Sequence, residues 1–185
     1  FSLLTFTVFP QRYSFINYST SDGLSQSQVN ALAQDSLGYL WVGTFGGLAR
    51  FNGTTFVNYS KLDGLLNNRV TFLEFLGGKL FVGHDNGISI LDANNNFKTF
   101  SFPENTTPSN VTGITKFNET IFVSTNGQGL FALRSEELQH MAKTPQRIRA
   151  LLNTQGDGLF IASREGVFNM NNQGKIQKIS VFPDE

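Results

Sequence analysis

The feature that most constrains the fold is an internal repeat with a period of about 40 residues. The segment FINYSTSDGLSQSQV, residues 15–29, returns as FVNYSKLDGLLNNRV, residues 56–70, with eight of fifteen positions identical. An apolar motif of the LWVGTFGGL type then recurs at spacings of 40, 41 and 38 residues. A fixed period of this length predicts a chain of equal structural units, each packed on its neighbours. The aromatic anchors of the motif are Trp41, Phe81, Phe122 and Phe160.

Each repeat contains four short apolar or aromatic segments separated by turn signals, which predicts four antiparallel strands. In the first repeat these strands are expected at residues 29–34, 39–44, 48–51 and 56–59. Four such strands in a unit of this length predict one blade of a β-propeller, and therefore an all-β fold. Only segment 135–143 approximates helical spacing, so a short helix or an irregular outer strand is expected there. The four blades are expected at residues 29–60, 70–102, 111–142 and 148–182.

The first repeat carries a specific set of motifs. Residues 22–60 contain D-G-L, then V-x-x-x-x-x-D, then G-x-L-W-V-G-T and G-G-L, and they close on an aromatic strand. This run resembles the two-component regulator propeller repeat family, and the second repeat fits the pattern well. The third and fourth repeats fit it less well, because Ser124 and Ala162 replace the glycine of W-V-G-T. The Trp-Asp pair of WD40 repeats is absent, and kelch repeats are longer.

The resemblance implies the extracytoplasmic sensor region of hybrid two-component histidine kinases, in which rings commonly have seven blades. Residues 12–19 match only the outer strand of a blade, so the partner strands of this segment are expected beyond residue 185. We therefore expect four consecutive four-stranded blades that form an open fragment of a larger ring of about seven blades. Closure by a second copy is the alternative.

Residues 1–11 begin with the apolar run FSLLTFTVF, which is far shorter than a membrane span. They are a candidate remnant of a secretory signal peptide, which would imply export. An outer strand or a frayed end is the alternative interpretation. Residues 12–185 are expected to form the propeller region.

Charge and residue content exclude several function classes. The 14 Lys+Arg balance 14 Asp+Glu, so the chain lacks the basic footprint of a nucleic-acid binder, and Arg147 and Arg149 are its only tight basic pair. The chain has no Cys, which excludes disulfide scaffolds, thiol nucleophiles and Cys-ligated metal sites. His84 and His140 have no second ligand at metal-binding spacing. We expect no catalytic residue, no cofactor and no metal site.

Several short motifs imitate known sites and are better explained by turns. Residues 127–132 match a dinucleotide-binding G-x-G-x-x-A, but a strand follows where a helix is required. Asp92, Asn94 and Asn96 imitate the start of a calcium loop, but Phe97 stands where glycine is required. A turn between two strands accounts for this run.

Other recurring positions of the repeat also favour structural roles. In Asp22-Gly23-Leu24, Asp is expected to bond its own backbone two residues on, Gly to adopt a left-handed turn, and Leu to fill the gap between blades. Asp35 is expected to accept hydrogen bonds in a turn, and Trp41 to pack between blades.

The antiparallel strand order places two kinds of loop on one face: the turns between the second and third strands, and the connections between blades. We call this the ligand face, because its loops are the richer in polar residues. For each candidate, pairing with neighbouring residues is the alternative, and for His84 a polar loop residue is favoured over a catalytic base. The candidates are His84, Asp85, Asn126, Arg164 and Glu165.

These observations predict a non-catalytic sensory or ligand-recognition propeller in the periplasmic input domain of a signalling histidine kinase. A carbohydrate is the candidate ligand, since Arg164 and Glu165 can each hydrogen-bond a hydroxyl. The expected partners are the remaining blades and the transmembrane kinase of the parent chain, with self-association of the fragment through its open ends. The alternatives are a lyase resembling the streptogramin-inactivating type, which needs a His and acid cluster, and a purely structural interaction platform.

Overall fold

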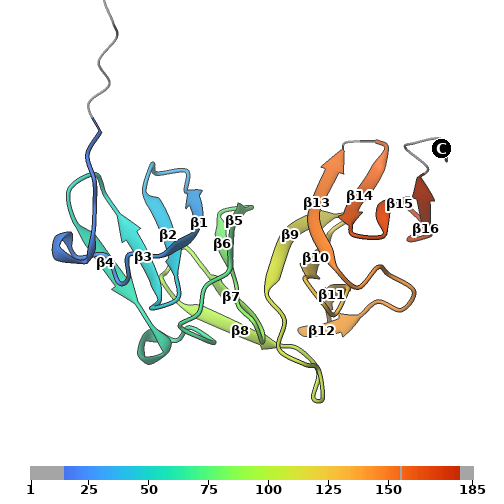
Figure 1. Ribbon diagram of the computed structural model, residues 1–185, viewed down its shortest axis with the longest axis horizontal. Coiled ribbons are helices and arrows are strands. Elements are labelled where there is room, and N and C mark those ends of the chain that lie inside the picture. Colours follow the sequence, from blue (N-terminus) through green and yellow to red (C-terminus); the bar gives the residue numbers. More distant parts are fainter. Residues whose placement is uncertain (1–14, 155, 180–185) are drawn as a thin grey trace, which may run out of the picture.

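The computed structural model describes residues 15–154 and 156–179, which form four four-stranded antiparallel sheets (Figure 1). In every sheet the strands lie side by side in chain order, so each sheet is one blade. Blades 1 and 2 contain β1 (Val29–Gln34), β2 (Leu40–Thr44), β3 (Leu48–Phe51), β4 (Phe56–Tyr59), β5 (Phe72–Leu76), β6 (Lys79–Gly83), β7 (Gly87–Leu91) and β8 (Phe97–Ser101). Blades 3 and 4 contain β9 (Val111–Phe117), β10 (Thr120–Thr125), β11 (Leu130–Arg134), β12 (Glu137–His140), β13 (Ile148–Thr154), β14 (Gly158–Ser163), β15 (Gly166–Met170) and β16 (Ile176–Ile179).

This arrangement confirms the predicted all-β fold of four consecutive blades. The strand bounds predicted for the first repeat differ from the structure by one residue, at the start of β2. The uncertain segment 135–143 forms an outer strand, β12, and not a helix. Helical structure within the described residues is confined to two short 3-10 turns, η1 (Thr20–Asp22) and η2 (Lys61–Asp63).

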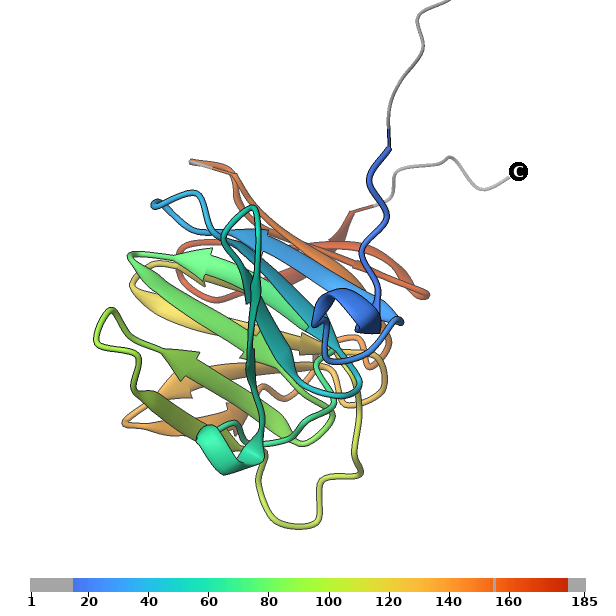
Figure 2. The ribbon, with the colours of Figure 1, turned by 90° about the vertical axis from the view of Figure 1, so that its left-hand side faces the viewer.

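The blades stack face to face along an arc, with the inner strands β1, β5, β9 and β13 next to one another (Figures 1 and 2). Three apolar layers fill the spaces between consecutive blades. Trp41, Phe81 and Phe122 are each buried in one of these layers, at 4%, 5% and 4% exposure. Phe160 has the same position in blade 4 and is only half-buried, because none of the described residues forms a blade beyond it. The aromatic anchors therefore hold neighbouring blades together, as predicted.

The glycine of W-V-G-T has a packing role. A Cβ atom at Gly43 would lie 2.5 Å from Val70 Cγ1 of the next blade, and one at Gly83 would lie 2.7 Å from Val111 Cγ1. Blade 3 has Ser124 at this position, and there the space is provided by Gly113, whose Cβ would lie 2.8 Å from Ser124 Oγ. The third repeat thus departs from the family pattern while keeping the close approach of its strands.

A row of hydrogen bonds joins the inner strands of successive blades. Asn30 Nδ2 donates to Val70 O at 3.1 Å, Thr71 Oγ1 to Val111 O at 3.2 Å, and Thr112 Oγ1 to Ile148 O at 2.8 Å. These donors lie at the same position of successive repeats. The acceptors Val111 and Ile148 begin the next inner strands, and Val70 lies two residues before β5. The same position in blade 4 is Arg149, which is exposed.

The two D-G-L segments close the 3-10 turns η1 and η2. Gly23 has a φ of 100° and Gly64 one of 108°, so both glycines adopt the expected left-handed turn. Leu65 is buried at 3% exposure in the apolar layer between blades 1 and 2, as predicted. Leu24 is buried at 6% exposure but packs on Val42 and Ala49 of blade 1, because none of the described residues forms a blade on its other side. The expectation for Asp22 was wrong in direction. Its carboxylate accepts from the backbone N of Ser19, three residues earlier, because a capping box satisfies the exposed N–H groups at the start of the turn.

Asp35 is a turn acceptor, as expected, and also reaches the next strand. Its Oδ1 accepts from the backbone N of Leu37 and Tyr39, and its Oδ2 accepts from Trp41 Nε1 at 2.9 Å. The turn and the blade anchor are therefore tied together by one carboxylate. The run from Asp92 to Asn96 is likewise a turn between β7 and β8, in which Asp92 Oδ1 accepts two backbone N–H groups.

The predicted outer strand at residues 12–19 is not formed in its described part. Residues 15–19 belong to no sheet, and Phe15 and Ile16 are 89% and 75% exposed. A strand is held by ladder hydrogen bonds to a neighbouring strand. The first sheet contains β1 to β4, and residues 15–19 are not among its strands. Residues 12–14, the candidate signal remnant at 1–11 and the expected end of the last strand at 180–182 lie outside the described residues.

Candidate ligand face

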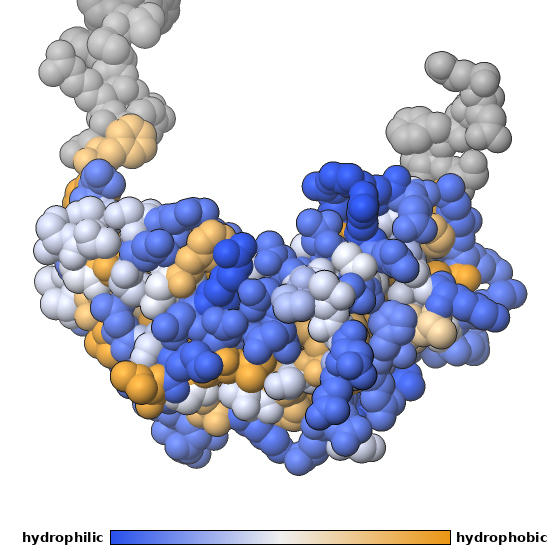
Figure 3. Space-filling view, turned by 60° about the horizontal axis from the view of Figure 1, so that its bottom comes forward, coloured by the Kyte–Doolittle hydropathy of each residue, from blue (hydrophilic) through white to orange (hydrophobic). Residues whose placement is uncertain are grey.

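The turns after β2, β6, β10 and β14 and the connections between blades emerge on the same side of the arc, because neighbouring strands are antiparallel. This is the lower side in Figure 1, where η2 lies. Figure 3 brings it forward and shows a largely hydrophilic surface interrupted by apolar patches, hollowed between the two ends of the arc. The four exposed or half-exposed candidates lie in two groups on this face.

The first group surrounds Asp85 in the turn after β6. Asp85 Oδ1 accepts from Asn67 Nδ2 at 3.0 Å, and Oδ2 lies 4.0 Å from Arg69 Nε. The Arg69 guanidinium in turn lies 3.8 Å from the centre of the Phe45 ring. The carboxylate and the guanidinium are therefore already engaged within the protein, which leaves them less free to bind a ligand.

His84 is fully buried and cannot touch a ligand on this face, which corrects its place among the candidates. Its Nδ1 donates to Arg69 O at 3.0 Å, and its Nε2 accepts from Ser89 Oγ at 2.9 Å. Burial lowers the pKa of His84 to about 4, against the opposing effects of the Arg69 hydrogen bond and the Asp85 charge. The imidazole is a neutral clamp between blade 2 and the connection that precedes it.

The second group joins blades 3 and 4. Asn126 forms an isolated antiparallel bridge with Arg147, and the backbone N of Arg164 donates to Arg147 O at 3.3 Å. Glu165 Oε1 accepts from the backbone N of Gln146 at 3.3 Å. The side chains of Asn126, Arg147, Arg164 and Glu165 are exposed. Within the described residues neither arginine of this group forms an ion pair, so two guanidinium groups are available to a ligand.

Sequence reasoning missed Arg69 as a member of the first group and Arg147 as the centre of the second. A signal was present, because both arginines directly precede the branched residue that opens the inner-strand segment, Val70 and Ile148. The two positions are therefore equivalent in the repeat. Their spacing of 78 residues is close to two periods of the repeat.

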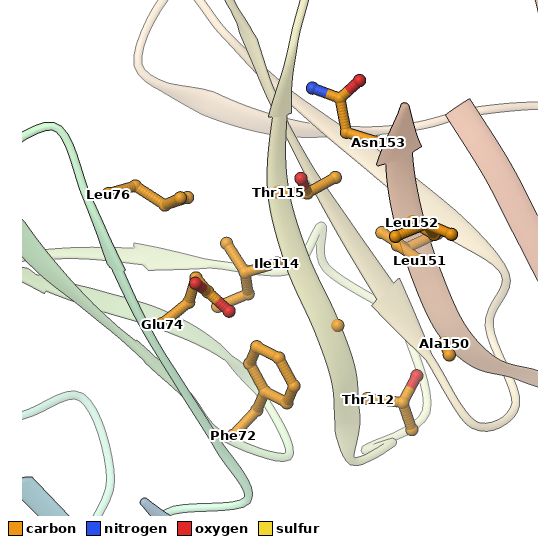
Figure 4. Close-up of a pocket in the computed structure, with 11 residues that line it drawn as sticks. Phe72, Glu74, Leu76, Thr112, Ile114, Thr115, Ala150, Leu151, Leu152 and Asn153 are labelled. Carbon is orange, nitrogen blue, oxygen red and sulfur yellow. The ribbon is translucent and has the colours of Figure 1, made fainter. Parts of the chain in front are cut away.

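A second hollow lies on the inner strands and was not anticipated from the sequence. It has a volume of about 300 Å³ and is lined by β5, β9 and β13 (Figure 4). Glu74 on β5 is its one ionisable lining residue, and burial raises the pKa of that carboxyl group. We call this space the hub hollow.

No group of three or more His, Asp or Glu residues in residues 15–154 and 156–179 lies close enough to hold a metal ion. No helix in the same residues has the length and apolar character needed to cross a bilayer.

Comparisons with known proteins agree with the repeat motifs. Residues 23–46 match the sequence model of the two component regulator propeller family. A histidine kinase of Formosa agariphila is 44% identical over 61 residues, which are 32% of this chain and 4% of that protein. This chain therefore spans a small part of the curated relative that it matches.

Two solved structures show the same fold. The extracellular domain of a hybrid two-component system of B. thetaiotaomicron superposes with a TM-score of 0.70 and 18% identity, over 90% of this chain and 26% of that domain. A catalytically inactive virginiamycin B lyase of Staphylococcus aureus with quinupristin superposes with a TM-score of 0.67 and 17% identity, over 84% of this chain and 56% of the lyase. Residues 23–46 thus carry a two-component regulator propeller repeat, and the four blades share the β-propeller fold of these two structures.

Proposed function

We propose that this chain is a non-catalytic ligand-recognition part of the extracytoplasmic input domain of a two-component histidine kinase. The family match and the likeness to a histidine kinase support the signalling context. The remaining blades and the transmembrane kinase of the parent protein are the partners that this context implies. The ligand that we propose is a carbohydrate.

The observation that carries the proposal is the contrast between the two groups on the ligand face. Around Asp85 the charges are paired, and the neighbouring His84 is buried with both ring nitrogens hydrogen-bonded. Around Arg147, two exposed guanidinium groups, one amide and one carboxylate lie on adjoining segments of blades 3 and 4, with no histidine among them. Such a set can bind hydroxyl or acidic groups of a sugar by hydrogen bonds.

The test uses the intact receptor with a transcriptional reporter and a panel of soluble polysaccharides. The double variant Arg147→Ala/Arg164→Ala should lower the reporter response to the active polysaccharide at least about tenfold, since each charged hydrogen bond contributes substantially to affinity. Asn94→Ala, in a turn on the opposite face, is the matched control and should leave the response unchanged. A normal response of the double variant, or loss in the control, would contradict the proposal.

The lyase alternative is favoured by one observation, the fold likeness to virginiamycin B lyase. It predicts turnover of a streptogramin B substrate that disappears in His84→Ala. Because the His84 side chain is fully buried and bonded at both nitrogens, we expect no turnover in the parent chain. Turnover that depends on His84 would move the function to the enzyme class.

A further inference from the structure

The hub hollow combines an apolar wall with one unpaired acidic group. Its volume of about 300 Å³ lies at the lower end of the range for ligand pockets, which favours a small ligand. In Figure 4 the side chains of Phe72, Glu74 and Leu76 leave β5 toward β9, and Leu152 lies on the facing strand β13. Three blades thus contribute to the same space.

The Glu74 carboxylate has no partner in the described parts of the chain, since neither a hydrogen bond nor an ion pair reaches it. It is half-buried beside Phe72 and Ile114 (Figure 4). Burial raises its pKa, as expected for a carboxyl group that loses water without gaining a donor. A carboxylate in such surroundings is stabilised by any cation that enters the hollow.

The neighbouring polar groups add acceptors and few donors. Thr112 Oγ1 already donates to Ile148 O at 2.8 Å. Asn153 Nδ2 donates to Lys116 O at 2.7 Å, and its Oδ1 points away from Glu74 (Figure 4). The Thr115 hydroxyl completes the polar part of the lining. One negative charge, a hydroxyl group and an aromatic ring together suit a compact cation with several N–H donors.

Lys116 also lies on β9, and its ammonium group is the obvious internal competitor. It pairs instead with Glu119, at 2.6 Å between Nζ and Oε2. The charge of Glu74 is therefore not neutralised by this lysine.

We propose that the hub hollow binds a primary alkylammonium ion, with Glu74 as its counter-ion and with Phe72, Leu76 and Leu152 around the alkyl stem. This site is separate from the ligand face and does not depend on the function proposed for that face. A free diamine and a lysine side chain of a peptide share this chemistry.

The test is calorimetric titration of the chain with cadaverine, with 1,5-pentanediol as the neutral compound of the same shape. Saturable binding of cadaverine and none of the diol is expected. Glu74→Gln should weaken binding at least about tenfold, as expected for loss of a charge-assisted contact. Glu137→Gln, which removes an exposed carboxylate on β12, should bind as the parent chain does. Equal binding of the diol, unchanged binding by Glu74→Gln, or no binding at millimolar cadaverine would overturn the proposal.

Two further variants keep the proposal open to refutation if Glu74→Gln is poorly folded. Leu152→Lys places a tethered ammonium at the wall and should also weaken cadaverine binding. Lys116→Gln should bind cadaverine as the parent chain does, because Lys116 pairs with Glu119. If neither Leu152→Lys nor Glu74→Gln weakens binding, the proposal is overturned. Titration with Nα-acetyl-lysine methylamide distinguishes the sources: binding of both compounds supports a peptide side chain, and binding of cadaverine alone supports a free diamine.

Discussion

The interfaces between blades and the two open ends of the arc are built from the same repeat positions but have different surroundings. Phe122 of blade 3 is 4% exposed because blade 4 covers it, whereas Phe160 at the same position of blade 4 is half-buried. Blade 1 has the complementary open face, an apolar hollow in which Leu32 is 57% exposed. The hollow is lined by Tyr18, Leu24, Val29, Leu32, Leu40, Val42, Phe51 and Phe56.

This difference shows that a blade without a neighbour leaves one of its apolar faces uncovered. Each sheet presents apolar side chains on two faces, and burial is complete only where a neighbour supplies the other half. Identical residues should therefore contribute unequally to stability according to their place in the arc.

The sharpest test compares the two anchors directly. Phe122→Ala should lower the free energy of unfolding by about 3–5 kcal/mol, because it leaves a cavity between two blades. Phe160→Ala should cost less than about half of that, because its ring already meets solvent. Urea unfolding followed by circular dichroism measures both, and equal losses would refute the contrast.

The second test uses the two histidines. The pKa of His84 is about 4 in the folded chain, against 6.5 for an ordinary histidine. Between pH 4 and pH 6.5 the imidazole is therefore protonated in the unfolded state but not in the folded state. Its contribution to the free energy of unfolding is complete above pH 6.5 and is lost as the pH falls toward 4. The expected loss is about 3 kcal/mol.

Urea unfolding at several pH values measures this slope. His84→Gln should flatten the slope, whereas His140→Gln, an exposed residue on β12, should leave it as in the parent chain. A parent-like slope in His84→Gln would show that the clamp is not the source of the pH dependence.

The third test concerns the open face of blade 1. We expect the 185-residue chain to self-associate through its open ends, as exposed apolar patches of this kind do. Leu32→Glu should weaken association by at least about tenfold, as measured by light scattering over a dilution series. Leu62→Glu, at a 98% exposed residue of η2, is the control and should have no effect. A parent chain that stays monomeric at every concentration would contradict the expectation.

The smallest effect is expected from the row of hydrogen bonds between inner strands. Thr112→Val removes the bond to Ile148 O and should destabilise the chain by about 1 kcal/mol. Thr99→Val, at an exposed position on β8, should change stability little. If both variants unfold at the same urea concentration, the row contributes nothing measurable.

The repeat made the blades predictable, because strand alternation and turn residues are local properties of the chain. The bounds of β1, β3 and β4 and the buried roles of Leu24 and Trp41 followed from position in the repeat. The capping direction of Asp22 was missed because it depends on the serine that precedes η1. The outer strand predicted at 12–19 is not formed in its described part, because a strand is defined by its neighbour as well as by its own residues.

The candidate site was less predictable than the fold. Loop position correctly placed Asp85, Asn126, Arg164 and Glu165 on one side of the arc. It could not separate them from His84, which is adjacent to Asp85 in sequence and fully buried. It also missed Glu74, since a single acidic residue in a strand has no local signal of its surroundings.

The sequence alone predicts the number of blades, their strand order and the residues that anchor one blade to the next. All three follow from the repeat of about 40 residues. Only the tertiary structure decided which polar groups are paired, which are buried and which remain available. Arg69 and Arg147 occupy the same repeat position, yet one contacts Phe45 and Asp85 while the other is exposed and unpaired in the described residues. The physical reason is that exposure and pairing depend on contacts between segments a full repeat apart, and these contacts exist only once the blades have stacked.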